Sequence, residues 1–90
     1  MDEEMEFKVS ARRNKLLGLW LAEKLRLSES EHDAYATGVV LSDLEEPGIE
    51  DIVRKVINDI ENHRANLSES EGRLKLDEFF GIAANEIASK

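Results

Sequence analysis

Two histidines, His32 and His63, are the residues whose type best suits acid–base or metal chemistry in this chain, which contains no cysteine. A nucleophile–base pair would need Ser, Thr or Lys next to one histidine. A metal site from His32 with Glu29, Glu31 or Asp33 is conceivable, but directly adjacent residues on a helix do not face each other. No glycines have the spacing of a phosphate-binding loop. The sequence therefore predicts neither an active site nor a metal site, and we expect both histidines to be solvated surface residues.

A second distinctive feature is the run ARRNKLLGLW at residues 11–20, in which three cations precede the chain's one tryptophan. On a helix, Arg12, Arg13 and Lys15 are expected to point in three directions. They could pair with acids of their own bundle, in residues 28–51. They could instead hold an anion such as a nucleotide phosphate, or bind a partner's acids, with arginine as a two-pronged donor.

The charge of the chain is concentrated in one segment. The formal net charge is −8, from 20 acids and 12 bases, and residues 28–51 hold eight acids and no Lys or Arg. This balance argues against a nucleic-acid-binding protein. The acidic segment is either a solvated face or a docking face for a basic partner. No apolar run is long enough to span a membrane, and the first residues lack a secretory signal, so we expect a cytoplasmic or membrane-peripheral protein.

Three breaks divide the chain into four predicted helices. Pro47-Gly48 is the strongest break, and the string LSESE occurs twice, at residues 27–31 and 67–71. In each string a Ser precedes a Glu by three residues, which is the pattern of a capping box; Ser30 is an alternative cap in the first string. The predicted helices cover residues 2–26, 29–45, 49–65 and 69–88. The fold class is therefore all-α, a four-helix bundle with short connections in a single domain of residues 1–90.

Apolar residues recur at helical spacing in each segment. Segment 49–65 has the clearest stripe, at Ile49, Ile52, Val53, Val56, Ile57 and Ile60. Segment 2–26 carries two stripes, so we expect it to be the central helix, with Trp20 in the core. Met5 and Phe7 lie near its start, where we predict few buried neighbours, and they are candidate partner anchors. Among the glycines, Gly38 and Gly81 lie beside alanines and predict close helix crossings, whereas Gly72 has no evident role.

Taken together, these strings resemble a small alphaproteobacterial family that includes the zeta subunit of the F1Fo-ATP synthase. The resemblance spans roughly residues 2–60 and rests on the most specific string, ARRNKLLGLW, and on shorter matches to either side. The shorter matches are Asp2-Glu3-Glu4, Phe7-Lys8, Ala34-Tyr35-Ala36, Val39-Val40, Asp43-Leu44-Glu45-Glu46, Glu50-Asp51 and Arg54-Lys55-Val56.

The resemblance implies a regulator rather than an enzyme. In that family a four-helix bundle binds the F1 sector, and an N-terminal arm inserts at the interface of the alpha, beta and gamma subunits and blocks the hydrolytic direction of rotation. Some members bind adenine nucleotide weakly, and Arg12, Arg13 and Lys15 are the residues expected to do so here. The expected partner-binding residues are Met5, Phe7, Arg12, Arg13 and Lys15. No other cofactor, no metal, no nucleic acid and no membrane insertion is implied.

The sequence departs from the family pattern at its start. Members with a full arm carry a further polar stretch ahead of the Asp-Glu-Glu and Phe-Lys strings, whereas this chain starts at those strings. We therefore expect docking on F1 with weak or no inhibition, by a protein that is monomeric when free and peripheral to the inner membrane when bound. The alternatives are an adenine-nucleotide sensor and a general acidic interaction module, neither of which inhibits F1.

Overall fold

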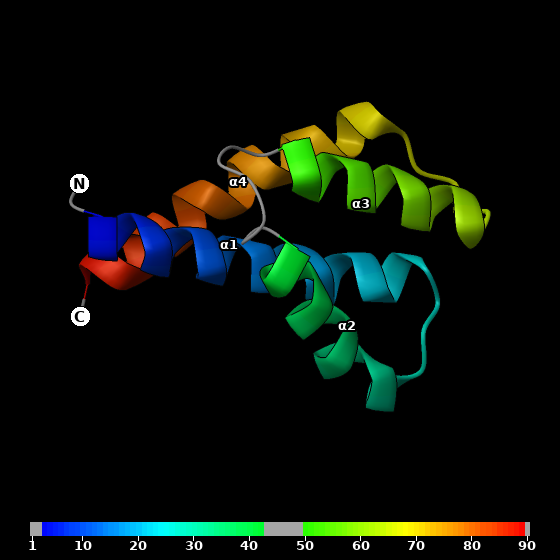
Figure 1. Cartoon of the computed structure of the whole chain (residues 1–90), viewed down its shortest axis with the longest axis horizontal. Coiled ribbons are helices and arrows are strands. Elements are labelled where there is room, and N and C mark those ends of the chain that lie inside the picture. The colour runs from blue at the N-terminus through cyan, green and yellow to red at the C-terminus, as the bar shows by residue number, and fades with distance from the viewer. Residues whose placement is uncertain (1–2, 43–49, 90) are drawn as a thin grey trace.

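The computed structural model describes residues 3–42 and 50–89, and these residues form four helices and no strand (Figure 1). The helices are α1 (Glu3–Lys24), α2 (Glu29–Ser42), α3 (Glu50–Asn62) and α4 (Glu69–Ala88). The predicted all-α four-helix bundle is confirmed. The Pro47-Gly48 break and the predicted helical residues 43–45 and 49 lie outside the described residues.

One apolar core joins all four helices. Its buried members are Leu17 and Leu21 of α1, Leu25 just after α1, Val39 of α2, Ile52, Val53, Val56 and Ile60 of α3, and Leu76 of α4. The α3 stripe is thus buried as its spacing predicted, with Ile57 partly buried beside it. Burying a Leu, Ile or Val side chain stabilises a fold by about 1.5–3 kcal/mol, so this cluster is the main source of stability.

The longest helix, α1, packs against both α2 and α4, as its two apolar stripes predicted. It runs through the middle of the molecule in Figure 1. Trp20 is half-buried rather than fully in the core: its ring packs against the core cluster, and Lys75 Nζ of α4 lies 5.7 Å from the ring centroid. A tryptophan ring is so large that it is rarely buried completely.

The close helix crossing lies at Gly18, not at the predicted glycines. A Cβ at Gly18 would lie 2.6 Å from Ala36 Cα, so α1 and α2 cross there with their backbones nearly in contact. Among residues 3–42 and 50–89, a Cβ at Gly38 or Gly81 would meet no atom within 4 Å, so the expected crossings of the described helices at these glycines are wrong. Gly72, for which the sequence suggested no role, faces Val56 of α3, whose Cγ1 lies 3.1 Å from the Cβ position.

Both LSESE strings begin a helix at the expected serine. The hydroxyl of Ser68 accepts a hydrogen bond from the Glu71 backbone N–H at 3.2 Å, which caps α4. In the other string, Ser28 Oγ donates to Glu31 Oε1 at 2.8 Å, and α2 begins directly after Ser28. Ser28, rather than the alternative Ser30, therefore precedes the first turn.

Helices α1 and α3 end earlier than predicted, because an arginine reverses the chain after each. Arg26 and Arg64 have φ values of 61° and 52°. After each arginine the next N–H bonds back across the turn, as in Ala65 N to Ile60 O at 3.0 Å. This is the Schellman arrangement, in which glycine is the usual residue at the left-handed position.

Replacing Arg64 with glycine is expected to raise the free energy of unfolding by roughly 0.5–1 kcal/mol, because a Cβ is unfavourable at positive φ. Urea unfolding followed by circular dichroism would measure this change. The matched control is Arg54→Gly in the middle of α3, where the same substitution is expected to cost about 1 kcal/mol. If both substitutions lowered the free energy of unfolding by the same amount, the left-handed conformation assigned to Arg64 would be contradicted.

Candidate partner-binding surface on α1

The N-terminal half of α1 lies beside the C-terminal half of α4, and the two helices run in opposite directions (Figure 1). Arg12 Nε donates to Glu86 Oε2 at 2.7 Å across this contact, and each of the two side chains is 39% exposed. An ion pair this exposed contributes less than about 1 kcal/mol. The pair therefore orients the two helices more than it stabilises them.

The three cations of the ARRNKLLGLW run do not surround one point. Arg12 and Lys15 are three residues apart, about 60° around the helix, and they share its outer side. Arg13 points inward: it is 7% exposed, and its Nε donates to Oδ1 of the buried Asn14 at 3.0 Å. The three cations therefore point in two directions rather than the expected three: Arg12 and Lys15 point outward, and Arg13 points inward.

Lys8 belongs to the same outer face, although the sequence analysis did not select it. Lys8, Arg12 and Lys15 recur at i, i+4 and i+7, which places them along one side of α1. We call these three residues the basic stripe. Lys8 forms an exposed ion pair with Glu4 at 3.2 Å, and Lys15 makes no ion pair with any residue that the structure describes. The spacing is present in the sequence, but the burial of Arg13 is what sets these three cations apart from it.

The acid that Arg12 meets among the described residues is Glu86 of α4, so Arg12 pairs with an acid of its own bundle. No described acid of segment 28–51 forms an ion pair with Arg12 or Lys15. The acids of that segment within residues 43–49 lie outside the described residues, so pairing with them stays a prediction.

Phe7 is an exposed aromatic residue at the start of α1. The apolar stripe to which it belongs is buried at Leu17, Leu21 and Leu25, half-buried at Ala11, and 60% exposed at Phe7. The stripe is thus covered by other helices at its C-terminal end and exposed to solvent at its N-terminal end. Met5 is half-buried and makes contacts within the fold. Of the two expected anchors, Phe7 is the one available to a partner.

The histidines are held by backbone carbonyls. His32 is half-buried, with Nε2 3.1 Å from Leu27 O, and His63 is exposed, with Nδ1 3.0 Å from Asp59 O. The solvated surface position expected for both is thus found for His63, whereas His32 packs against the turn that precedes α2. Within residues 3–42 and 50–89, no three His, Asp or Glu residues come close enough to hold a metal ion.

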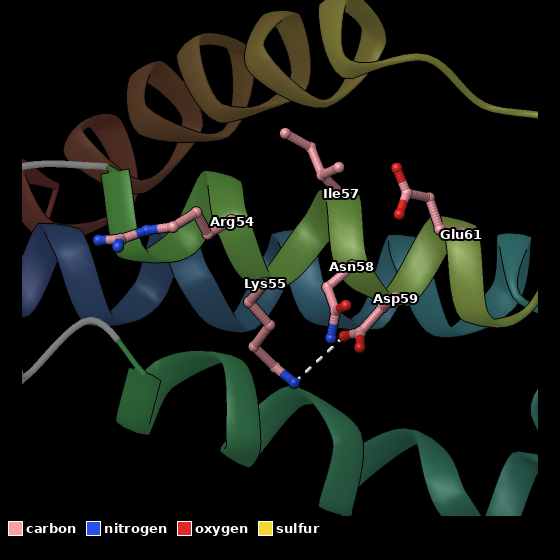
Figure 2. Close-up of a pocket in the computed structure, with 6 residues that line it drawn as sticks. All are labelled: Arg54, Lys55, Ile57, Asn58, Asp59 and Glu61. Carbon is pink, nitrogen blue, oxygen red and sulfur yellow. Dashed lines mark ion pairs between the residues drawn. The ribbon is translucent and has the colours of Figure 1, made fainter.

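A second polar cluster, which the sequence analysis missed, joins α2 to α3. Tyr35 OH donates to Asp59 Oδ2 at 2.5 Å, Lys55 Nζ lies 3.1 Å from the same oxygen, and Lys55 also lies over the tyrosine ring. Figure 2 shows Lys55 and Asp59 on the α2 side of an open hollow along α3, while Ile57 and Glu61 point the other way. These side chains do not converge on a common point, so the cluster connects two helices rather than forming a binding site. We call Tyr35, Lys55 and Asp59 the α2–α3 tie.

This tie predicts a loss of stability at alkaline pH. Burial, and the hydrogen bond and negative charge of Asp59, raise the pKa of Tyr35 far above its ordinary value of 10.0. The unfolded chain therefore releases the phenolic proton first. The stabilisation is complete below about pH 10 and declines as pH rises above it.

Urea unfolding at increasing pH is expected to show this decline, and Tyr35→Phe is expected to lack the tyrosine contribution to it. Because the chain has one tyrosine, absorbance reports on this group alone. Ionisation of Tyr35 near pH 10 in the folded protein would contradict the prediction.

No helix among the described residues is long and apolar enough to cross a membrane.

Comparison with known proteins places this bundle in a family. The family model described as ATPase inhibitor subunit zeta matches residues 1–86. A protein described as "Solution NMR structure of the protein" is 44% identical, with a TM-score of 0.82 over 94% of this chain and 96% of that chain. No curated protein gives a significant match. Since the family match spans nearly the whole sequence, the chain belongs to the ATPase inhibitor subunit zeta family.

Proposed function

We propose that this protein docks on the F1 sector of ATP synthase through the N-terminal half of α1 and opposes ATP hydrolysis by sterically blocking rotation. Membership of an inhibitor family supports the F1-directed role. The observation that supports the choice of surface is that Phe7 and Lys8, the first residue of the basic stripe, are both exposed near the start of α1. On this proposal the protein is monomeric when free, and it acts on the cytoplasmic side, peripheral to the inner membrane.

The residues of this surface have separate roles. Lys8, Arg12 and Lys15 pair with acids at the interface of the alpha, beta and gamma subunits, where complementary charge speeds association and fixes orientation. Phe7 supplies the apolar contact, because a buried aromatic ring is the usual energetic centre of an interface. Arg13 is packed inside the bundle, so it holds α1 in place rather than contacting F1.

Part of the proposal is that inhibition is weak. From Val9 onward α1 is fixed in the bundle, since Val9 has no exposed surface and Arg12 is paired with α4. A helix held in this way binds as part of the bundle, so we expect it to contribute more to docking than to blocking rotation.

The test is ATP hydrolysis by purified F1 from an alphaproteobacterium, with and without the protein, paired with a pull-down on the same sample. Binding with partial inhibition is the expected result. Inhibition as strong as that of a homologue with a full arm would overturn the proposed weakness. Failure to recover any F1 subunit would overturn docking itself and favour a general acidic interaction module.

A further inference from the structure

The outward side of α4 is a helix face that the bundle leaves uncovered. Leu74 is 67% exposed, the largest fraction among the exposed large hydrophobic residues of the described chain. Asp77, Glu78 and Gly81 follow it at i+3, i+4 and i+7, and all three are exposed. This spacing puts the four residues on one side of the helix. We call them the α4 face.

Gly81 has no packing reason within its own fold. A glycine inside a helix lowers helix stability relative to alanine. At Gly18 and Gly72 the missing side chain allows a neighbouring helix to approach, whereas a Cβ at Gly81 would meet no atom of a described residue within 4 Å. The residue therefore leaves backbone accessible on an outer surface, where a partner helix can approach closely.

The charges of the α4 face select the kind of helix that fits. Asp77 and Glu78 flank the apolar line, and none of the four residues is basic. Glu78 is paired with Lys75 at 2.8 Å, but Asp77 makes no ion pair with a described residue. A complementary helix must carry Lys or Arg beside an apolar side chain that packs on Leu74 and Gly81.

The α4 face and the basic stripe of α1 lie on different sides of α4. Glu86, which pairs with Arg12, is roughly 120–140° around the helix from Leu74 and Gly81, at 100° per residue. A partner that contacts both surfaces must present acids opposite α1 and bases opposite α4, so the two signs fix its orientation.

We propose that the α4 face is a second docking surface for F1 and that its occupant is a basic amphipathic helix of an F1 subunit. This inference rests on the proposed docking of α1 to F1 and deepens it, because it adds the chemistry of a second contact. On this proposal the two surfaces contact F1 with opposite charges, and Gly81 lets the occupying helix lie close to α4.

The test measures the affinity of the full chain for purified F1, and its central variant is Gly81→Gln. Glutamine fits the open position and is a good helix former, so the melting temperature is expected to rise by about 4 °C. Its side chain blocks the close approach, so the affinity is expected to fall about tenfold. A more stable protein that binds less tightly cannot be explained by misfolding.

Leu74→Gln is expected to lower the affinity by about the same factor, since an apolar anchor is lost. The matched control is Leu41→Gln, because Leu41 is also strongly exposed, at 57%, but lies on α2. The control is expected to bind like the wild type.

Wild-type affinity in both Gly81→Gln and Leu74→Gln, with weakened binding in Lys15→Glu, would overturn this inference and leave the α1 proposal standing. Absence of wild-type binding to F1 would overturn both. A free chain that sediments as a dimer, and that Leu74→Gln turns into a monomer, would assign the face to a second copy and overturn the F1 helix as its occupant.

Discussion

Gly18→Leu is expected to lower the free energy of unfolding by about 3 kcal/mol, near the upper end of the usual cost of overpacking a core. The first side-chain carbon would lie 2.6 Å from Ala36 Cα and 3.3 Å from Val39 Cγ2. Because the nearest atom belongs to the backbone, rotation of a side chain cannot relieve the contact, and α1 and α2 must separate. In a domain of this size, with roughly 5–13 kcal/mol of total stability, that loss is large.

The matched control for this prediction is Gly81→Leu. The same side chain there enters open space, and the helix propensity of leucine exceeds that of glycine by about 0.8 kcal/mol. Urea unfolding followed by circular dichroism should therefore show a strong loss at position 18 and no loss at position 81. Similar effects at the two positions would contradict the close crossing of α1 and α2.

Reversing two charges of the basic stripe, Lys8→Glu with Lys15→Glu, is expected to weaken binding to F1 about a hundredfold. Each reversal replaces an attraction with a repulsion across the interface, and like charges brought together cost several kcal/mol. Both side chains are exposed, and Lys15 has no ion pair with a described residue, so the fold should survive. The affinity of each variant for purified F1 gives the measurement.

The control is Lys24→Glu, which makes the same change of charge at the far end of the same helix, where the side chain is also exposed. Its affinity should equal that of the wild type at moderate salt, where charges beyond about 10 Å are screened. If Lys24→Glu weakens binding as much as a reversal at Lys15 does, net charge rather than the basic stripe governs association.

Local features of this fold were predictable from the sequence because they depend on neighbours along the chain. The α3 stripe follows from spacing alone, since residues three and four apart share a helix face. The Ser28 and Ser68 starts follow from hydrogen bonds that span three residues. The left-handed arginines at positions 26 and 64 were not predicted, because glycine is the residue usually found at such a position.

Features that depend on how helices lie in space were not predictable in this way. Gly81 and Gly18 both interrupt helical segments, and only the placement of α2 distinguishes the open position from the crowded one. Arg13 was assigned to the surface by its type, yet it lies on the side of α1 that faces the interior. The tie between Tyr35 and Asp59 joins residues 24 positions apart, on two helices that lack a local signal for pairing.

The candidate site, like the fold, was predictable only in part from the sequence. The sequence identified Phe7, Arg12 and Lys15, because an aromatic residue and cations stand together in a run that resembles a known family. It did not select Lys8, and it did not separate Arg13 from its neighbours. The α4 face was not predicted, because Leu74 has no distinctive sequence context and Gly81 was expected at a close helix crossing.

The most direct test of the docking surface is a photo-crosslinking measurement with a photoreactive phenylalanine analogue at position 7 of the full chain. Phe7 is exposed, so the replacement leaves the core unchanged. On illumination with purified F1, we expect a covalent product with an F1 subunit, and no such product from the same analogue at exposed position 41 on α2. Crosslinking from position 41 with none from position 7 would contradict docking through α1.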